Sequence, residues 1–141
     1  MNIHPDTARA RLVLRMLGPD GSDRPVRADL AYRPDDPYAV RVAFHAGSDD
    51  VVEWTFARQL LSDGVTRPTG DGDVRVWPTE DRSDGHGVCL SLSSPSGQAI
   101  FSASPGPIKG FLSQTYTMVP PGGESNFIDL DAELELLLTG D

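Results

Sequence analysis

Cysteine and histidine are scarce in this chain of 141 residues, and their scarcity excludes several kinds of site. The single cysteine, Cys89, cannot form an internal disulfide and suits a reducing cytoplasm. The three histidines, His4, His45 and His86, have no zinc-ligand spacing to one another or to Cys89, and a zinc site needs about four ligands. We therefore expect no metal and no cofactor, and we interpret His45 as a surface residue at a strand end.

Positive charge is also scarce, because 12 Lys and Arg residues stand against 21 Asp and Glu residues. Lys109 is the only lysine, and the formal net charge is −9. Phosphate backbones and anionic membranes attract proteins largely through Lys and Arg, so we expect neither nucleic acid nor a membrane surface as a partner. No apolar run is long enough for a transmembrane helix, and no signal-peptide pattern follows Met1. The sequence therefore predicts a cytoplasmic protein.

Residue patterns typical of catalysis are missing as well. Nucleophilic catalysis needs a base beside a Ser, Thr or Cys, but the serines between Ser91 and Ser96 alternate along a predicted strand and continue into a turn. Cys89 is interpreted as a small apolar filler in the same strand. The segment from Thr69 to Asp73 is glycine-rich, yet it lacks both the lysine of a phosphate loop and the closing glutamate of a calcium loop. We expect a tight turn there and no enzymatic activity.

Alternation of apolar and polar residues is the strongest pattern that the chain does contain. Val26, Ala28 and Leu30 alternate with polar or small residues, which is typical of a strand with one buried face. Short polar turns separate such segments, so antiparallel hairpins are expected. Pro78 has no N–H to donate and is expected to end its strand, followed by a charged loop over residues 79–85. Strands are predicted at about residues 8–17, 26–33, 38–45, 51–56, 74–77, 86–93 and 98–103.

Three helices are predicted from apolar residues at helical spacing. The first covers residues 56–61, and Gly64 follows as a glycine free to adopt the left-handed cap. The second begins near Pro107, and the third covers residues 130–138. The buried stripe of the second helix is expected to consist of Ile108, Phe111, Leu112 and Thr115. The sequence thus predicts one α+β domain over residues 8–138, with about seven mostly antiparallel strands and three helices.

Arg75 and Trp77 are the candidate partner-binding residues. They lie two positions apart on a predicted strand and therefore share one face of it. An exposed arginine beside a tryptophan is the composition of an interface hot spot. The alternative interpretation is structural: Trp77 covers an open side of the sheet, and Arg75 stacks on its ring. Arg58 and Arg67 belong to the same group of arginines that we weigh as possible contacts.

A series of short motifs also runs in order through the chain. The most specific is Arg67-Pro68-Thr69-Gly70 followed by Gly72-Asp73-Val74-Arg75-Val76-Trp77-Pro78. The others are Asp36-Pro37-Tyr38-Ala39-Val40, Val52-Glu53-Trp54 with Phe56-Ala57-Arg58, Leu60-Leu61 before Gly64, Leu92-Ser93-Ser94-Pro95 with Gly97, Phe111-Leu112, Val119-Pro120-Pro121-Gly122, and Asp129-Leu130-Asp131 with Glu133-Leu134. This ordered set, from about Leu12 to Leu138, resembles the SsgA-like proteins, the sporulation and cell-division family of actinomycetes. The resemblance is closest to the SsgB branch.

The resemblance implies a non-enzymatic role in cell division. Family members act in septum placement, and the SsgB branch positions and recruits FtsZ, the tubulin-like division GTPase, at future sporulation septa. The expected partner is therefore FtsZ or another divisome protein, in the cytoplasm at the division septum. The family fold resembles the Whirly single-stranded nucleic-acid binders, which implies a Whirly-like domain and a homotrimer. Leu136 lies off the apolar stripe of the third predicted helix and is interpreted as a subunit contact.

Two functions of different classes remain open. The first is an acidic division adaptor that binds proteins. The second is a single-stranded nucleic-acid-binding module, suggested by fold analogy, which does not carry function by itself. Such a module needs a positive groove and stacking aromatic side chains. A net charge of −9 and aromatic residues at mostly inward positions favour the adaptor.

Overall fold

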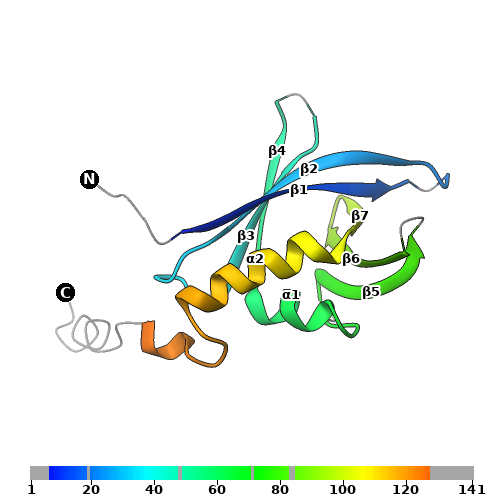
Figure 1. Ribbon diagram of the computed structural model, residues 1–141. Coiled ribbons are helices and arrows are strands. Elements are labelled where there is room, and N and C mark those ends of the chain that lie inside the picture. Colours follow the sequence, from blue (N-terminus) through cyan, green and yellow to red (C-terminus); the bar gives the residue numbers. More distant parts are fainter. Residues whose placement is uncertain (1–6, 19, 48, 71, 83–84, 128–141) are drawn as a thin grey trace.

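The computed structural model describes residues 7–127, except for residues 19, 48, 71 and 83–84. In this part of the chain, seven strands form one antiparallel sheet in the order β4-β3-β2-β1-β7-β6-β5 (Figure 1). The strands are β1 (Ala8–Leu17), β2 (Asp23–Tyr32), β3 (Ala39–His45), β4 (Val51–Ala57), β5 (Val74–Arg82), β6 (Gly85–Ser94) and β7 (Gly97–Ala103). The helices are α1 (Arg58–Gly64), α2 (Pro105–Met118) and the short 3-10 helix η1 (Glu124–Phe127).

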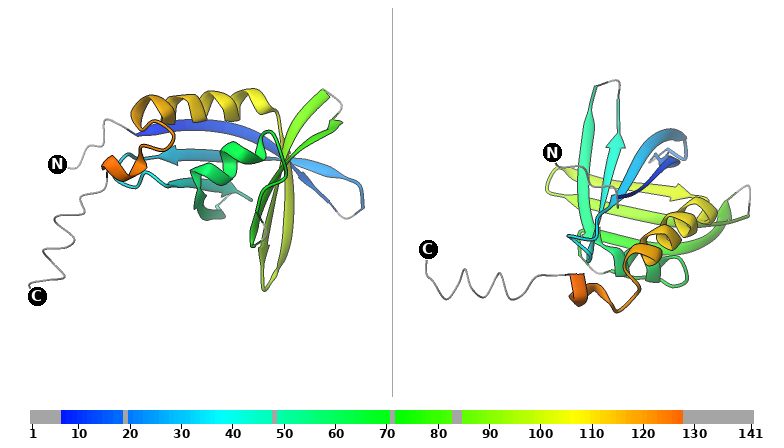
Figure 2. Two further views of the ribbon diagram at one scale, coloured as in Figure 1. Left: turned by 90° about the horizontal axis from the view of Figure 1, so that it is seen from below. Right: turned by 60° about the vertical axis from the view of Figure 1, so that its left-hand side comes forward.

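The sheet is strongly curled, and both α-helices lie on the same side of it (Figure 2). α2 packs mainly against β1, and α1 packs against β5 and β4. The apolar core fills the space between helices and sheet, where the rings of Phe44 and Phe101 stack with centroids 4.8 Å apart. Fully burying one such large apolar side chain contributes about 1.5–3 kcal/mol. The sheet therefore has a helix-covered face that holds the core and an outer face that neither α-helix covers.

The predictions from alternation are confirmed for the first strands. β1 has the expected bounds, and on β2 the side chains of Val26, Ala28, Leu30 and Tyr32 are all buried. Alternation over the strand predicted at residues 51–56 would place Val52 on the same inward face as Phe56, and this is wrong, because Val52 is 47% exposed. β4 forms one edge of the sheet and has a neighbouring strand on one side only, so its first residues are accessible to solvent.

The prediction that Pro78 ends its strand is also wrong. β5 continues to Arg82, so most of the charged loop expected over residues 79–85 is strand. β5 is the second edge of the sheet, and proline is tolerated in an edge strand because an outward-facing N–H has no ladder partner there. Part of this edge is nevertheless covered, since Thr69 and Val76 exchange backbone hydrogen bonds of 2.8 and 3.0 Å.

Gly64 has a different role from the left-handed cap that the sequence predicts. It is the last residue of α1, and it is not among the glycines with positive φ. A Cβ atom at this position would lie 2.2 Å from Cγ1 of Val76. Glycine is therefore needed because α1 approaches β5 closely, not because the backbone is left-handed. The helix also begins at Arg58 instead of Phe56, which still belongs to β4.

α2 confirms the predicted stripe, since its buried residues are Ile108, Phe111, Leu112 and Thr115. It begins at Pro105, earlier than the expected Pro107, and a proline is again found in its first turn, where no N–H is required. The described residues hold two α-helices where the sequence predicts three in the chain, and the third, over residues 130–138, lies outside them. The α+β class and the antiparallel sheet are confirmed. A Whirly-like fold stays a prediction.

Candidate functional site

β5 places the candidate residues Arg75 and Trp77 on the outer face of the sheet. Arg75 is exposed and Trp77 is half-buried, while Val76 between them is fully buried in the core. Trp77 lies opposite Cys89, which is only 6% exposed, so Trp77 helps to shield this part of the sheet. The cation–π contacts of the described residues are both made by Arg58, so Arg75 does not stack on Trp77. A role of the pair in partner binding stays a prediction.

Arg58, which the sequence places among the possible contacts, is buried with 2% of its surface exposed. Its Nη1 donates to the carbonyl oxygen of Val119 at 2.7 Å, and its Nη2 donates to Oε2 of Glu124 at 3.0 Å. Its guanidinium carbon also lies 4.9 Å from the ring centre of Tyr32 and 5.1 Å from that of Tyr116. Arg58 therefore joins the start of α1 to the end of α2 and to η1. Its role is structural.

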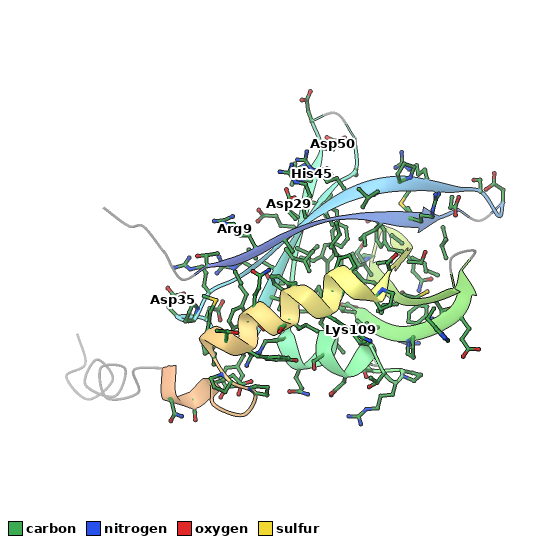
Figure 3. All side chains as sticks on the ribbon, in the orientation of Figure 1. Arg9, Asp29, Asp35, His45, Asp50 and Lys109 are labelled. Atoms are coloured by element: carbon green, nitrogen blue, oxygen red, sulfur yellow. The ribbon has the colours of Figure 1, made fainter. Side chains whose placement is uncertain are left out.

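A concentration of arginine lies on the outer face of β1–β4. The strand register sets outward residues side by side in two rows, Arg9–Ala31–Arg41–Thr55 and Arg11–Asp29–Ala43–Glu53. Figure 3 shows Arg9 and Asp29 on the side of the sheet away from α2, which carries Lys109. We call this surface the open face and define it by Arg9, Arg11, Asp29, Ala31, Arg33, Ala39, Arg41, Ala43 and Glu53.

A groove of about 960 Å³ runs across the open face. Alanines lie between longer charged side chains in both rows, and their short side chains explain why the surface is hollowed. The charged residues that line the groove are the arginines Arg9, Arg11, Arg33 and Arg41 and the carboxylates Asp29, Asp36 and Glu53. The groove is therefore locally rich in arginine, in a chain whose net charge is −9.

Asp29 joins Arg11 of the open face to His45 at the end of β3. Its Oδ1 accepts a hydrogen bond from Nε of Arg11 at 3.0 Å, and its Oδ2 accepts one from Nε2 of His45 at 2.9 Å. Partial burial raises the pKa of Asp29, but the hydrogen bonds from His45 and Arg11 outweigh it and leave this pKa below its ordinary value. His45 is thus more than the surface strand-end residue that the sequence predicts, because it belongs to this network.

Sequence reasoning missed the open face, although a signal for it was present. Arg9 and Arg11 occupy outward positions of β1, and Arg41 occupies one on β3, while Arg33 directly follows the end of β2. These residues are distant in sequence and come together only once the strand order and register are known. Pairing the first two predicted strands as a hairpin would already have set Arg11 opposite Asp29.

The described residues hold neither a metal-binding cluster nor a membrane-spanning helix. Among residues 7–127, with the gaps given above, no three His, Cys, Asp or Glu side chains lie close enough together to hold a metal ion. None of the helices described there is long and apolar enough to cross a membrane. That the protein needs no metal or cofactor stays a prediction.

Comparison with known proteins identifies the family. The model of the family described as Streptomyces sporulation and cell division protein, SsgA, matches residues 26–124. The chain belongs to the SsgA-like family. It is 57% identical over 140 residues to the sporulation-specific cell division protein SsgB of Frankia casuarinae, covering 99% of this chain and 97% of that protein. It is 49% identical over 133 residues to SsgB of Streptomyces coelicolor, covering 94% and 96%.

Solved structures agree with this assignment. One, reported with mutations in SsgB that correlate to longitudinal cell division during sporulation of Streptomyces coelicolor, superposes with a TM-score of 0.84 at 45% identity and covers 91% of this chain and 100% of that chain. The SsgA-like sporulation-specific cell division protein from Thermobifida fusca has a TM-score of 0.83 at 47% identity, covering 96% and 98%. The resemblance to SsgA-like proteins of actinomycetes is confirmed, and it supports a role in cell division. The family is one of cell-division proteins, not of enzymes.

Proposed function

We propose that this protein is a non-enzymatic cell-division adaptor, which binds FtsZ or another divisome protein and helps to position the division machinery at sporulation septa. The observation that carries the proposal is the match over 99% of the chain to a protein named sporulation-specific cell division protein SsgB. The adaptor would act in the cytoplasm at the division septum. It would need no cofactor, because its function is binding.

The second candidate function is single-stranded nucleic-acid binding, and the arginines of the open face are the observation that favours it. Two features of the same groove weigh against it. Three carboxylates line the groove among the arginines, and they would repel phosphates. The residues lining the groove include no phenylalanine, tyrosine or tryptophan on which bases could stack. We therefore prefer a protein partner.

Co-sedimentation with FtsZ polymers tests the proposal, with a single-stranded oligonucleotide titrated in parallel at physiological salt. We expect the protein to pellet with FtsZ polymers, to stay in the supernatant without them, and to leave the oligonucleotide unbound. If the oligonucleotide binds at submicromolar affinity while FtsZ sediments alone, the nucleic-acid function replaces the adaptor.

Within this proposal, Arg75 and Trp77 contact the partner. Arg75→Ala and Trp77→Ala are expected to keep the fold and to lower the fraction that co-sediments with FtsZ, because arginine and tryptophan dominate interface energetics. Arg24→Ala is the matched control, since Arg24 is exposed near the start of β2 and lies outside this pair. If both variants fold and bind like the wild type, the adaptor function is kept, but Arg75 and Trp77 are not its contact residues.

We also propose that the protein forms homotrimers. β4 is an edge strand on which Val51 and Val52 are 50% and 47% exposed, and an exposed strand edge favours pairing with another chain. The subunit contact predicted for Leu136 lies outside the described residues. Sedimentation equilibrium at micromolar concentration is expected to report a trimer. A result showing monomer alone would remove this proposal.

A further inference from the structure

We infer that the open face binds an extended acidic segment of a protein partner. The inference rests on the proposed function in taking that partner to be a division protein. Its basis is the segregation of charge: a chain with 21 acidic and 12 basic residues gathers four arginines, Arg9, Arg11, Arg33 and Arg41, in one groove. Such a gathering on a surface that neither α-helix covers is complementary to carboxylates.

The arginines are spaced for an extended chain. Arg9 and Arg11 lie two residues apart on β1, so their side chains project from the same face about 7 Å apart. In an extended peptide, side chains two residues apart have the same spacing of about 7 Å. Carboxylates at alternate positions of such a peptide can therefore meet Arg9 and Arg11 in register, while Ala31 and Ala43 leave room for its backbone.

Three of these arginines, Arg9, Arg11 and Arg41, keep N–H donors that the protein itself does not use. Arg11 contacts Asp29 at 3.0 Å and Arg41 contacts Asp36 at 3.5 Å, yet their side chains are 66% and 53% exposed. Arg9 is exposed and forms no ion pair with any residue that the structure describes. A guanidinium has five N–H donors and can bind a carboxylate through two of them, so Arg9, Arg11 and Arg41 can each bind a further carboxylate.

The composition of the groove favours a peptide over a nucleic acid. Asp29, Asp36 and Glu53 interrupt the positive charge, and a continuous polyanion would have to pass all three. A peptide can place its carboxylates opposite the arginines and uncharged residues, such as hydroxyl side chains, opposite the acids.

Fluorescence anisotropy with a defined probe tests the inference on the full chain. The probe is a fluorescein-labelled peptide in which aspartate alternates with threonine, and a lysine–threonine peptide and oligothymidine serve as comparison ligands. The test variant is Arg9→Ala/Arg41→Ala, because both side chains are exposed. The control variant is Arg15→Ala/Arg24→Ala, which removes two positive charges from exposed positions outside the open face.

We expect the wild type and the control variant to bind the aspartate peptide alike, and the test variant to bind it at least about tenfold more weakly, which corresponds to the loss of about one charge-assisted hydrogen bond. Equal weakening in both variants would mean that net charge and not the open face attracts the peptide, and would overturn the inference. If oligothymidine binds more tightly than the aspartate peptide, and Arg9→Ala/Arg41→Ala abolishes that binding, the groove is a nucleic-acid site instead. A wild type that binds no aspartate peptide would also refute the inference.

Co-sedimentation separates this inference from the proposed function. If the wild type pellets with FtsZ polymers and Arg9→Ala/Arg41→Ala pellets equally well, the adaptor function stands and the open face is not its site. If the aspartate peptide binds the open face while FtsZ sediments alone, the site stands and FtsZ is not the partner. The inference is supported when the test variant loses both the peptide and the polymers.

Discussion

On the helix-covered side of the sheet, Arg58 is 2% exposed and is held by a carboxylate, a backbone carbonyl and two aromatic rings. On the open face, Arg11 and Arg41 each have one carboxylate partner, and more than half of each side chain is exposed. The two sides of one sheet thus use the same residue type under opposite conditions.

The difference follows from the cost of removing a charge from water. A buried guanidinium is stable only when protein groups replace its hydration, so removal of a partner leaves an uncompensated charge. An exposed guanidinium remains hydrated and can exchange water for a ligand's carboxylate at little cost to the fold. We therefore expect substitutions at Arg58 to act on stability and substitutions on the open face to act on binding.

The largest effect is expected from Arg58→Ala, which should lower the free energy of unfolding by ~3–5 kcal/mol because it leaves the buried Glu124 without its ion-pair partner and the carbonyl of Val119 without this donor. Urea denaturation followed by circular dichroism measures it. Arg58→Lys keeps the charge but not the planar fork, and is expected to remain clearly less stable than the wild type. A loss below about 1 kcal/mol for Arg58→Ala would be as small as that of an exposed ion pair. It would contradict the difference between the two sides of the sheet.

A smaller effect is expected from Gly64→Ala, at about 1–3 kcal/mol of destabilisation, because its Cβ would overlap Val76. Gly110→Ala in α2 is the matched control: a Cβ there meets nothing within 4 Å, so the better helix former should stabilise by about 0.5–1 kcal/mol. Thermal unfolding of the two variants should shift in opposite directions. Shifts of the same sign would mean that α1 does not approach β5 as closely as described.

The smallest effect is expected from acid, which weakens the ion pair between Glu124 and Arg58. Hydrogen bonds from its own backbone N–H and from Arg58 lower the pKa of Glu124 below its ordinary value of 4.5. Since the folded-state pKa is the lower one, the stabilisation is fully present above pH 4.5 and is lost as the pH falls through that lower pKa. Glu124→Gln should therefore be less stable than the wild type at neutral pH, and the difference should narrow on acidification. A gap that stays constant or widens down to low pH would contradict this account.

Much of the sheet could be predicted from the sequence because alternation is a local property. The alternation of Val26, Ala28 and Leu30 indicates which face of the strand is buried, whichever strands lie beside it. The errors arise where neighbouring strands and side chains determine the local structure. Pro78 is compatible with a strand only because β5 is an edge, and Gly64 is required only because Val76 lies against it.

Neither the buried position of Arg58 nor the open face could be predicted, because both depend on residues that are distant in the sequence. Arg58 follows directly after a strand and has no apolar neighbour pattern that marks it as buried, and its partner Glu124 lies 66 residues away. The open face combines residues of four strands, so it requires the register as well as the strands themselves. The motif that contains Arg75 and Trp77 indicates the family, but not which surface binds.

The division between the two sides is tested most directly by measuring stability and FtsZ co-sedimentation of Arg9→Ala/Arg41→Ala in one set of samples. We predict a free energy of unfolding within about 1 kcal/mol of the wild type, as expected for exposed arginines, together with a clear loss of protein from the FtsZ pellet. A variant that is as stable as the wild type and pellets with FtsZ to the same extent would contradict the assignment of binding to the open face.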